Sequence, residues 1–292
     1  MDIGRVGIWT FCEEMSAAEA AALAVRIERL GYKTLWIPEA IGREALVSAA
    51  WLLAATERLN VATGIANVYA RDPVTMAAGA KTLAEQSGGR FLLGVGVSHR
   101  PLVEGVRGHD YGRPLSYMRT YLERMEVAPY AAVAPAEPPP VVIGALHPKM
   151  LALAAEKTRG AHPYLVPPEH TAFARAQLGR GPWLCPEQKV LLETDATKAR
   201  AVARQAIAMY LTLPNYRRNL ARFGFTDADF DGMGSDRLVD AVVAWGDEKA
   251  IAARVKAHHD AGADHVCVQP LHPEGIPLPD WRIVEALAPG TR

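Results

Sequence analysis

A short apolar run followed by a helix-forming segment recurs along this 292-residue chain until its end. The helix-forming segments carry start and stop signals, such as the capping-box pattern from Ser16 to Glu19 and the glycine at Gly31. This alternation of strand and helix patterns predicts successive β-α units. The expected strands span residues 5–10, 33–38, 59–66, 90–97, 141–144, 161–166, 188–194 and 265–269.

Eight such units predict a (β/α)8 TIM barrel, for which about 250 residues are typical. The chain is expected to form a single domain, 1–292, with an extra helical segment at about 205–246 between the seventh and eighth strands. A doubly wound sheet is the competing α/β architecture, and it would place a glycine-rich turn after the first strand. Because the segment from Thr10 to Glu14 contains no glycine, the barrel is preferred.

The charge balance limits the partners that the protein can have. With 32 basic and 32 acidic residues, the chain has no net positive charge that would attract nucleic acid or anionic lipid. A small-molecule substrate is therefore expected. No apolar run is long enough for a membrane span and no signal peptide is recognisable, which predicts a cytoplasmic protein. Cys12, Cys185 and Cys267 lie far apart, so reduced thiols and no metal are expected.

Polar residues gather at the predicted carboxyl ends of the strands, where barrel enzymes place their chemistry. The densest stretch runs from Leu59 to His99, where Gly, Asn, Ser, His and Arg follow two successive strands. The other strand ends contribute Thr10, Glu13, Glu14, Pro38, Glu39, residues 144–147, residues 162–164 and Gln269.

Several motifs resemble the bacterial-luciferase-like superfamily of flavin and deazaflavin oxidoreductases. They are the segments 34–39 (TLWIPE), 63–65 (TGI), 71–73 (RDP), 82–85 (TLAE), 89–96 (GRFLLGVG) and 262–264 (GAD). More narrowly, residues 96–103 (GVSHRPLV) with 107–111 (RGHDY) are similar to an actinobacterial subgroup that uses the deazaflavin coenzyme F420. The resemblance covers nearly the whole chain and implies a TIM barrel that binds this coenzyme.

The resemblance also implies where the cofactor ring lies. In similar proteins a non-prolyl cis peptide at the end of the third strand supports the ring, and here the matching bond is expected between Asn67 and Val68. Gly94 and Gly96 are expected to leave clearance for a flat ligand. The residues implied to bind the ring are Gly64, Ala66, Asn67, Val68, Gly96 and Ser98.

A cofactor phosphate is expected at a helix N-terminus, which supplies backbone N–H donors without a basic side chain. In similar proteins the phosphate lies near the ends of the fifth and sixth strands. Gly144, Ala145, His162 and Pro163 are the matching positions.

His99 is the leading catalytic candidate, because an imidazole at a strand end can exchange a proton near neutral pH. Glu39 is a second candidate, although the superfamily often has a histidine where Ala40 stands here. Glu13 is a third. Arg71 is expected to pair with Asp72 or another nearby carboxylate. His109 and Tyr111, in the loop after the fourth strand, are candidates to line a substrate pocket.

These observations predict an oxidoreductase that moves a hydride between C5 of coenzyme F420 and a small organic substrate, either an alcohol or carbonyl compound or an activated double bond. The alternatives are an FMN-dependent monooxygenase on the same barrel and a cofactor-binding protein without turnover. A homodimer through the second and third helices is expected, with residues 51–53 and 76–80 as candidate contacts.

Overall fold

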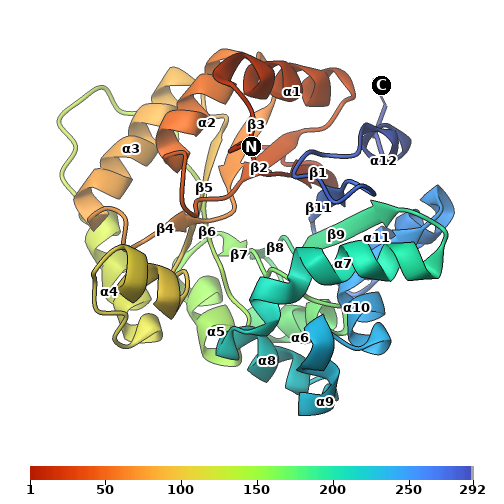
Figure 1. The fold of residues 1–292 in the computed structure, drawn as a ribbon. Coiled ribbons are helices and arrows are strands. Elements are labelled where there is room, and N and C mark those ends of the chain that lie inside the picture. The colour runs from red at the N-terminus through yellow and green to blue at the C-terminus, as the bar shows by residue number, and fades with distance from the viewer. Residues whose placement is uncertain (291–292) are drawn as a thin grey trace.

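A single curled sheet of parallel strands forms the centre of the computed structural model, which describes residues 1–290, and helices surround it (Figure 1). The sheet has 11 strands in the described residues. They are β1 (Val6–Trp9), β2 (Thr34–Ile37), β3 (Asn60–Thr63), β4 (Ala66–Asn67), β5 (Phe91–Gly96), β6 (Val141–Ile143), β7 (Gly160–Ala161), β8 (Trp183–Leu184), β9 (Glu187–Leu192), β10 (Val243–Gly246) and β11 (Val266–Leu271).

The sheet closes on itself through β8 and β9. β11 pairs with β1, and the order then runs β2, β3, β5, β6, β7 and β8. Cys185 and Pro186 alone separate β8, which pairs with β7, from β9, which pairs with β11. The N–H of Cys185 donates to the carbonyl of Ala161 at 2.9 Å, so the pairing continues across this break. The predicted barrel is therefore confirmed.

The helices follow the strands as the sequence predicts, with local differences. They are α1 (Ala17–Arg29), α2 (Ala45–Ala54), α3 (Pro73–Gln86), α4 (Pro114–Glu126), α5 (Pro148–Lys157), α6 (Pro168–Leu178), α7 (Ala196–Leu211), α8 (Pro214–Ala221), α9 (Asp227–Phe230), α10 (Asp236–Val242), α11 (Glu248–Asp260) and α12 (Trp281–Ala286). A π-helical turn, η1 (Pro101–Val106), follows β5, and a 3₁₀ turn, η2 (Asp231–Met233), follows α9. The Ser16–Glu19 capping box is present.

Three details of the predicted elements were wrong. The expected strand 161–166 ends at Ala161, because Pro163 lacks an N–H and Leu165 has a φ of 55°. The sequence after the seventh strand also predicts a long helical region from about Asp195 to Arg222, and the structure interrupts it before Pro214, which begins α8. The short strands β8 and β10 were not predicted, and β10 extends the sheet from the outer edge of β9.

The barrel interior is aromatic as well as aliphatic. Trp9, Trp36, Leu92, Cys185 and Cys267 belong to one buried cluster inside the sheet. The thiols of Cys12, Cys185 and Cys267 are free and buried. No helix within residues 1–290 combines the length and the apolar character that crossing a membrane requires.

Candidate functional site

The bend between β3 and β4 forms a platform at the mouth of the barrel. The Gly64–Ile65 peptide is cis, so the prediction of a cis bond at Asn67–Val68 was wrong: Ala66 and Asn67 pair instead with β5 as extended strand. The half-buried Ile65 side chain lies over Gly96 and Gly144. A Cβ on Gly96 would come within 2.6 Å of Ile65 Cδ1. Gly96 therefore leaves room for Ile65, a residue that the sequence analysis did not single out.

Gly94 accommodates the chain's own backbone. A Cβ on Gly94 would come within 2.0 Å of the Thr63 carbonyl oxygen. The clearance expected there for a flat ligand is therefore used by β3, and the surface available to a ring is that of Ile65.

Glu39 and Arg71 hold the bend from behind. Glu39 Oε2 accepts hydrogen bonds from the Asn67 N–H at 2.6 Å and from Arg71 Nη1 at 3.1 Å. Arg71 also forms ion pairs with the carboxylates of Glu39 and Glu44. Since these donors engage its carboxylate, we infer that Glu39 positions the bend. The expected pairing of Arg71 with a nearby carboxylate is confirmed, whereas Asp72 caps α3.

His99 stands where β5 meets η1. Its ring lies 5.5 Å from the ring of Tyr216 in α8, measured between centroids. Burial lowers the pKa of His99 to about 4, so the expected exchange of a proton near neutral pH is corrected: the imidazole is neutral at pH 7 and is a weaker base than a free imidazole. The preceding Ser98 has a φ of 54°, and its carbonyl accepts a hydrogen bond from the Tyr111 hydroxyl at 3.2 Å.

His162 lies inside the barrel beneath the bend. It stacks on Trp36 with ring centroids 4.6 Å apart, and its Nδ1 donates to the Cys185 carbonyl at 2.7 Å. Its Nε2 finds no hydrogen-bond partner within the described residues, and a Cβ on Gly64 would approach it to 3.1 Å. The expected place of His162 at a phosphate-binding helix start is thus corrected, because its ring fills the interior. The Pro163 carbonyl accepts from the Glu187 N–H.

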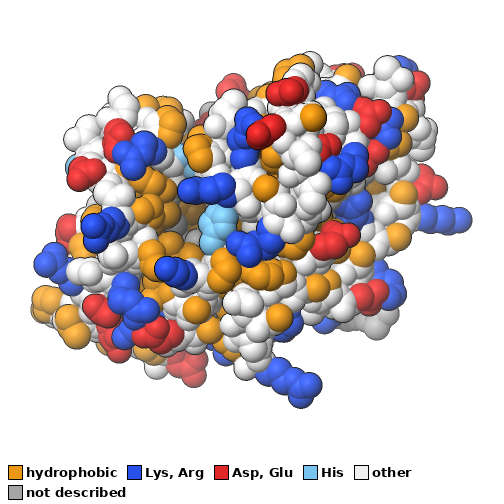
Figure 2. All heavy atoms as spheres, turned by 90° about the horizontal axis from the view of Figure 1, so that it is seen from below, with side chains coloured by type: hydrophobic (Ala, Val, Ile, Leu, Met, Phe, Trp, Pro, Cys, Tyr) orange, Lys and Arg blue, Asp and Glu red, His pale blue; other side chains and the backbone are white. Residues whose placement is uncertain are grey.

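The N-terminus of α5 carries the basic groups that the sequence analysis missed. Gly144 and Ala145 lead into α5, where His147 is the N-cap and makes no side-chain capping bond among residues 1–290. Burial and the charges of Arg218 in α8 and of Arg222, the residue that caps the end of α8, lower the pKa of His147. Figure 2 views the molecule from the side where α5, α6, α8 and α9 lie, and shows a histidine flanked by Lys or Arg side chains. Nothing local in the sequence brings α8 to α5.

A buried ion pair lies on the inner face of β9. Lys189 Nζ is 3.2 Å from Glu187 Oε1, and both side chains are 1% exposed. Lys189 Nζ also lies 3.9 Å from the centroid of the Tyr164 ring. Tyr164 donates to Gln269 Oε1 at 2.9 Å, and its oxygen is 3.0 Å from the Tyr210 hydroxyl. Gln269 and Tyr164 were expected at strand ends; the alternation of Glu187 and Lys189 on one strand face was the missed signal.

The remaining candidates lie apart from one another. Glu13 accepts a hydrogen bond from the Cys12 N–H at 3.0 Å. Tyr111 stacks against Tyr69, with centroids 5.8 Å apart. His109 is exposed and lines a cavity of about 480 Å³ together with Tyr117 of α4 and residues of the loop before α3. Within residues 1–290, no three His, Cys, Asp or Glu side chains cluster as metal ligands would.

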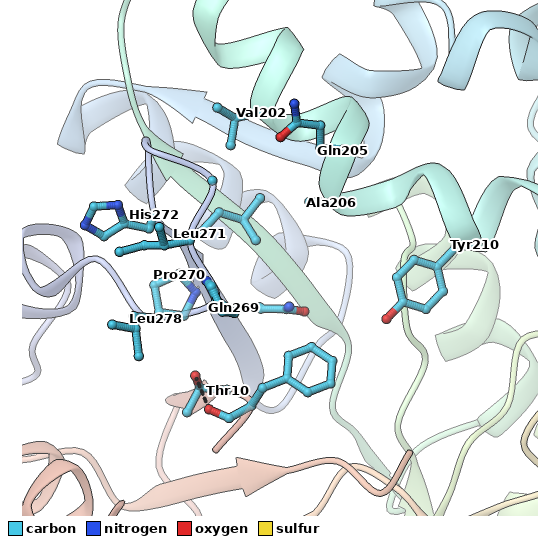
Figure 3. Close-up of a pocket in the computed structure, with 14 residues that line it drawn as sticks. Thr10, Val202, Gln205, Ala206, Tyr210, Gln269, Pro270, Leu271, His272 and Leu278 are labelled. Carbon is cyan, nitrogen blue, oxygen red and sulfur yellow. Dashed lines mark hydrogen bonds between the residues drawn. The ribbon is translucent and has the colours of Figure 1, made fainter. Parts of the chain in front are cut away.

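A second cavity, of about 230 Å³, opens between the carboxyl ends of β1 and β11 and the side of α7 (Figure 3). Gln269 and Tyr210 line it. Tyr216 lies between Tyr210 and His99, with centroid distances of 5.5 Å to each. Tyr164, Tyr210 and Tyr216 therefore form a tyrosine cluster that connects this cavity with His99.

Comparison with known proteins agrees with this architecture. A protein of Mycobacterium tuberculosis, provisionally named a coenzyme F420-dependent oxidoreductase, is 29% identical over 249 residues, which cover 71% of each chain. A 5,10-methylenetetrahydromethanopterin reductase of Archaeoglobus fulgidus is 24% identical over 310 residues, covering 90% of this chain and 93% of the relative.

Solved structures share the fold at low sequence identity. The coenzyme F420-dependent tetrahydromethanopterin reductase of Methanopyrus kandleri has a TM-score of 0.73 at 17% identity and covers 98% of this chain and 97% of its own. An F420-dependent secondary alcohol dehydrogenase has a TM-score of 0.78 at 14% identity, covering 97% and 96%. The profile of the luciferase-like monooxygenases matches residues 3–265. The chain therefore belongs to the luciferase-like monooxygenase family.

Proposed function

We propose that this protein is a coenzyme F420-dependent oxidoreductase that transfers a hydride between the deazaflavin and a small organic substrate. The observation that carries the proposal is that an apolar platform and a basic helix N-terminus meet at Gly144. A Cβ there would lie 3.7 Å from Ile65 Cγ2, and the chain then leads directly into α5. A flat ring with a phosphate-bearing tail needs both surfaces side by side.

Unpaired buried groups near the platform support the same assignment. Asn67 is fully buried, and its Nδ2 lacks a hydrogen-bond partner in the described part of the chain, as does His162 Nε2. Buried polar atoms without partners are uncommon in folded proteins and are expected to be satisfied by something bound. Because the His162 ring lies beneath the bend, inside the barrel, Asn67 of β4 is the residue that we place against the cofactor, where its amide would donate to a carbonyl at the edge of a deazaflavin or flavin ring.

The bound deazaflavin supplies a site that accepts or donates a hydride. In the alcohol-oxidising direction, the substrate carbon loses the hydride while the neutral His99 imidazole accepts the hydroxyl proton. FMN is the alternative cofactor, and a Baeyer-Villiger monooxygenase solved in complex with FMN shares the fold with a TM-score of 0.70 at 15% identity.

The basic groups beside α5 give a test of the cofactor's orientation. We expect the double variant Arg218→Gln, Arg222→Gln to bind coenzyme F420 at least about tenfold more weakly, because each hydrogen bond to a charged group contributes roughly 1.5–3 kcal/mol. The deazariboflavin that lacks the phosphate should bind both proteins equally. Fluorescence titration measures both affinities, and an equal loss for the two ligands would exclude a phosphate contact. Arg204→Gln, whose guanidinium pairs with Asp236 elsewhere on the chain, is the matched control.

We further propose that α2 is part of a homodimer interface. Of the expected contacts, Leu52, Leu53, Met76, Ala77 and Ala80 are buried in the core of the protomer. Val47 and Trp51 remain exposed on α2, at 69% and 51%, and Ile41 precedes them at 68%. Exposed apolar side chains that lie together are typical of interfaces.

The variant Val47→Asp is expected to shift the protein from dimer to monomer, because it buries a charge in the apolar interface. The change should not harm the helix itself, since an acidic residue is favourable in the first turn. Light scattering coupled to size-exclusion chromatography measures the mass. Val133→Asp, at an equally exposed valine outside α2, is the control and should leave the dimer intact. A dimer that persists in Val47→Asp would exclude this surface.

A further inference from the structure

The cavity beside α7 is lined by apolar side chains and a few polar ones, without a Lys, Arg, Asp or Glu among the described residues. Phe11, Val202, Leu271 and Ile276 supply apolar walls, and the loop from His272 to Leu278 covers one side. His272 has its Nδ1 turned toward the Glu274 N–H, from which it accepts at 3.3 Å.

The nearest buried charges cancel each other. Lys189 and Glu187 are paired beneath Tyr164, and the Tyr164 ring covers the Lys189 ammonium. A charged ligand in the cavity would therefore lose its water without gaining a counter-charge. Burying an unpaired charge is far more costly than burying a hydrogen-bonded neutral group.

A few neutral polar groups point into this apolar space. The single Tyr164 hydroxyl proton is donated to Gln269 Oε1, so the Tyr210 hydroxyl donates to the Tyr164 oxygen. This leaves the Gln269 amide N–H groups as donors at the cavity wall. Gln205 of α7 offers a second amide, and Figure 3 shows it on the same helix as Tyr210, across the cavity from Gln269. Amide donors of this kind suit a ligand carbonyl or hydroxyl oxygen.

We propose that this cavity binds an uncharged, largely apolar molecule that carries one carbonyl or hydroxyl group. That such a molecule is the substrate of hydride transfer rests on the proposed function. The assignment excludes phosphorylated and carboxylate compounds from this cavity, and it makes Gln269 and Gln205 the groups that orient the ligand oxygen.

The test compares three probes of nearly the same shape, 4-phenylbutan-2-one, 3-phenylpropanoate and 3-phenylpropylammonium. Saturation-transfer NMR on the full chain, without cofactor, measures their binding. We expect the ketone to bind and both ions to bind at least about tenfold more weakly, because neither finds a counter-charge. Ala206→Leu, which fills the cavity from α7, should abolish the ketone signal. Ala201→Leu, at an exposed alanine on the same helix, should retain it.

Val202→Phe provides a second cavity-filling change in case Ala206→Leu does not fold. Equal binding of the ketone and either ion would overturn the proposal, as would an undiminished ketone signal in both folded cavity-filling variants. Titration of the same samples with coenzyme F420 distinguishes a failure of the cavity assignment from a failure of the proposed function. If the wild type binds the ketone but no deazaflavin, the proposed function fails and the cavity assignment stands.

Discussion

Acidification from pH 7 to below pH 5 is expected to unfold this protein cooperatively. Burial lowers the pKa of His99, His162, His170 and His265 to about 4 and that of His258 to about 3. An unfolded chain binds a proton at each of these histidines near pH 6.5, whereas the folded chain does not. Stability is therefore fully present above pH 6.5 and is lost as the pH falls from 6.5 toward 4.

The contacts of these imidazoles explain why protonation is costly. His265 Nδ1 donates to the Gly4 carbonyl, and its Nε2 accepts from the Trp36 indole at 3.0 Å, so a second ring proton would meet a donor. His258 Nε2 donates to Gln188 Oε1 and its Nδ1 contacts the Thr171 hydroxyl, so the cost of its protonation comes from burial of the charge. Since one pKa unit corresponds to about 1.4 kcal/mol, each histidine contributes up to about 3 kcal/mol at neutral pH. The five contributions together are comparable with the whole stability of a typical domain, about 5–15 kcal/mol.

Urea denaturation at a series of pH values measures this effect. The free energy of unfolding should fall by up to about 1.4 kcal/mol per pH unit for each buried histidine below pH 6.5. In His170→Phe the new ring would pack between Phe173 and Phe223. This variant should reduce the slope of the free energy of unfolding against pH by the share of one histidine, up to about 1.4 kcal/mol per pH unit. His109→Gln, at an exposed position, should leave the slope unchanged. A free energy of unfolding that is the same at pH 7 and pH 5 would contradict the account.

His99→Ala is expected to lower kcat for alcohol oxidation by about 10²- to 10⁴-fold, the usual contribution of a positioned general base. The affinity for coenzyme F420 should change little, because the platform and the basic helix start do not involve this imidazole. Imidazole added to the assay should restore part of the lost rate, which a merely structural role of His99 would not produce.

His259→Ala is the control for the catalytic test. This histidine lies on α11 and bonds to the Ala263 carbonyl, on the outer layer of the barrel. Its replacement should leave kcat unchanged. A His99→Ala variant with full turnover on a good substrate would remove His99 from the mechanism and point to the tyrosine cluster beside it.

The barrel could be predicted from the sequence because its signals are local. Apolar strands, the Ser16 capping box and prolines at helix starts each act within a few residues. β8 and β10 were missed since two and four residues carry too little pattern. Residues 243–246 form a strand because they pair with β9, and this pairing exists only in the folded chain.

The site could be predicted only in outline. The structure brings Asn67, His99 and Gly144 to the mouth of the barrel, as expected of strand ends, while their part in a cofactor site stays a prediction. Their partners were not predicted, because they come from distant parts of the chain: Arg218 reaches α5 from a helix about 70 residues away, and Tyr216 reaches His99 from the same helix. His162 was misplaced for the same reason, since nothing in its sequence neighbourhood tells whether the ring points into the barrel or toward a helix start.

The most direct test of the account is a fluorescence titration of the purified wild-type protein with oxidised coenzyme F420 and, separately, with FMN. We expect micromolar or tighter binding of the deazaflavin and binding of FMN that is at least about tenfold weaker. Preference for FMN would contradict the account and would favour the monooxygenase alternative on the same barrel.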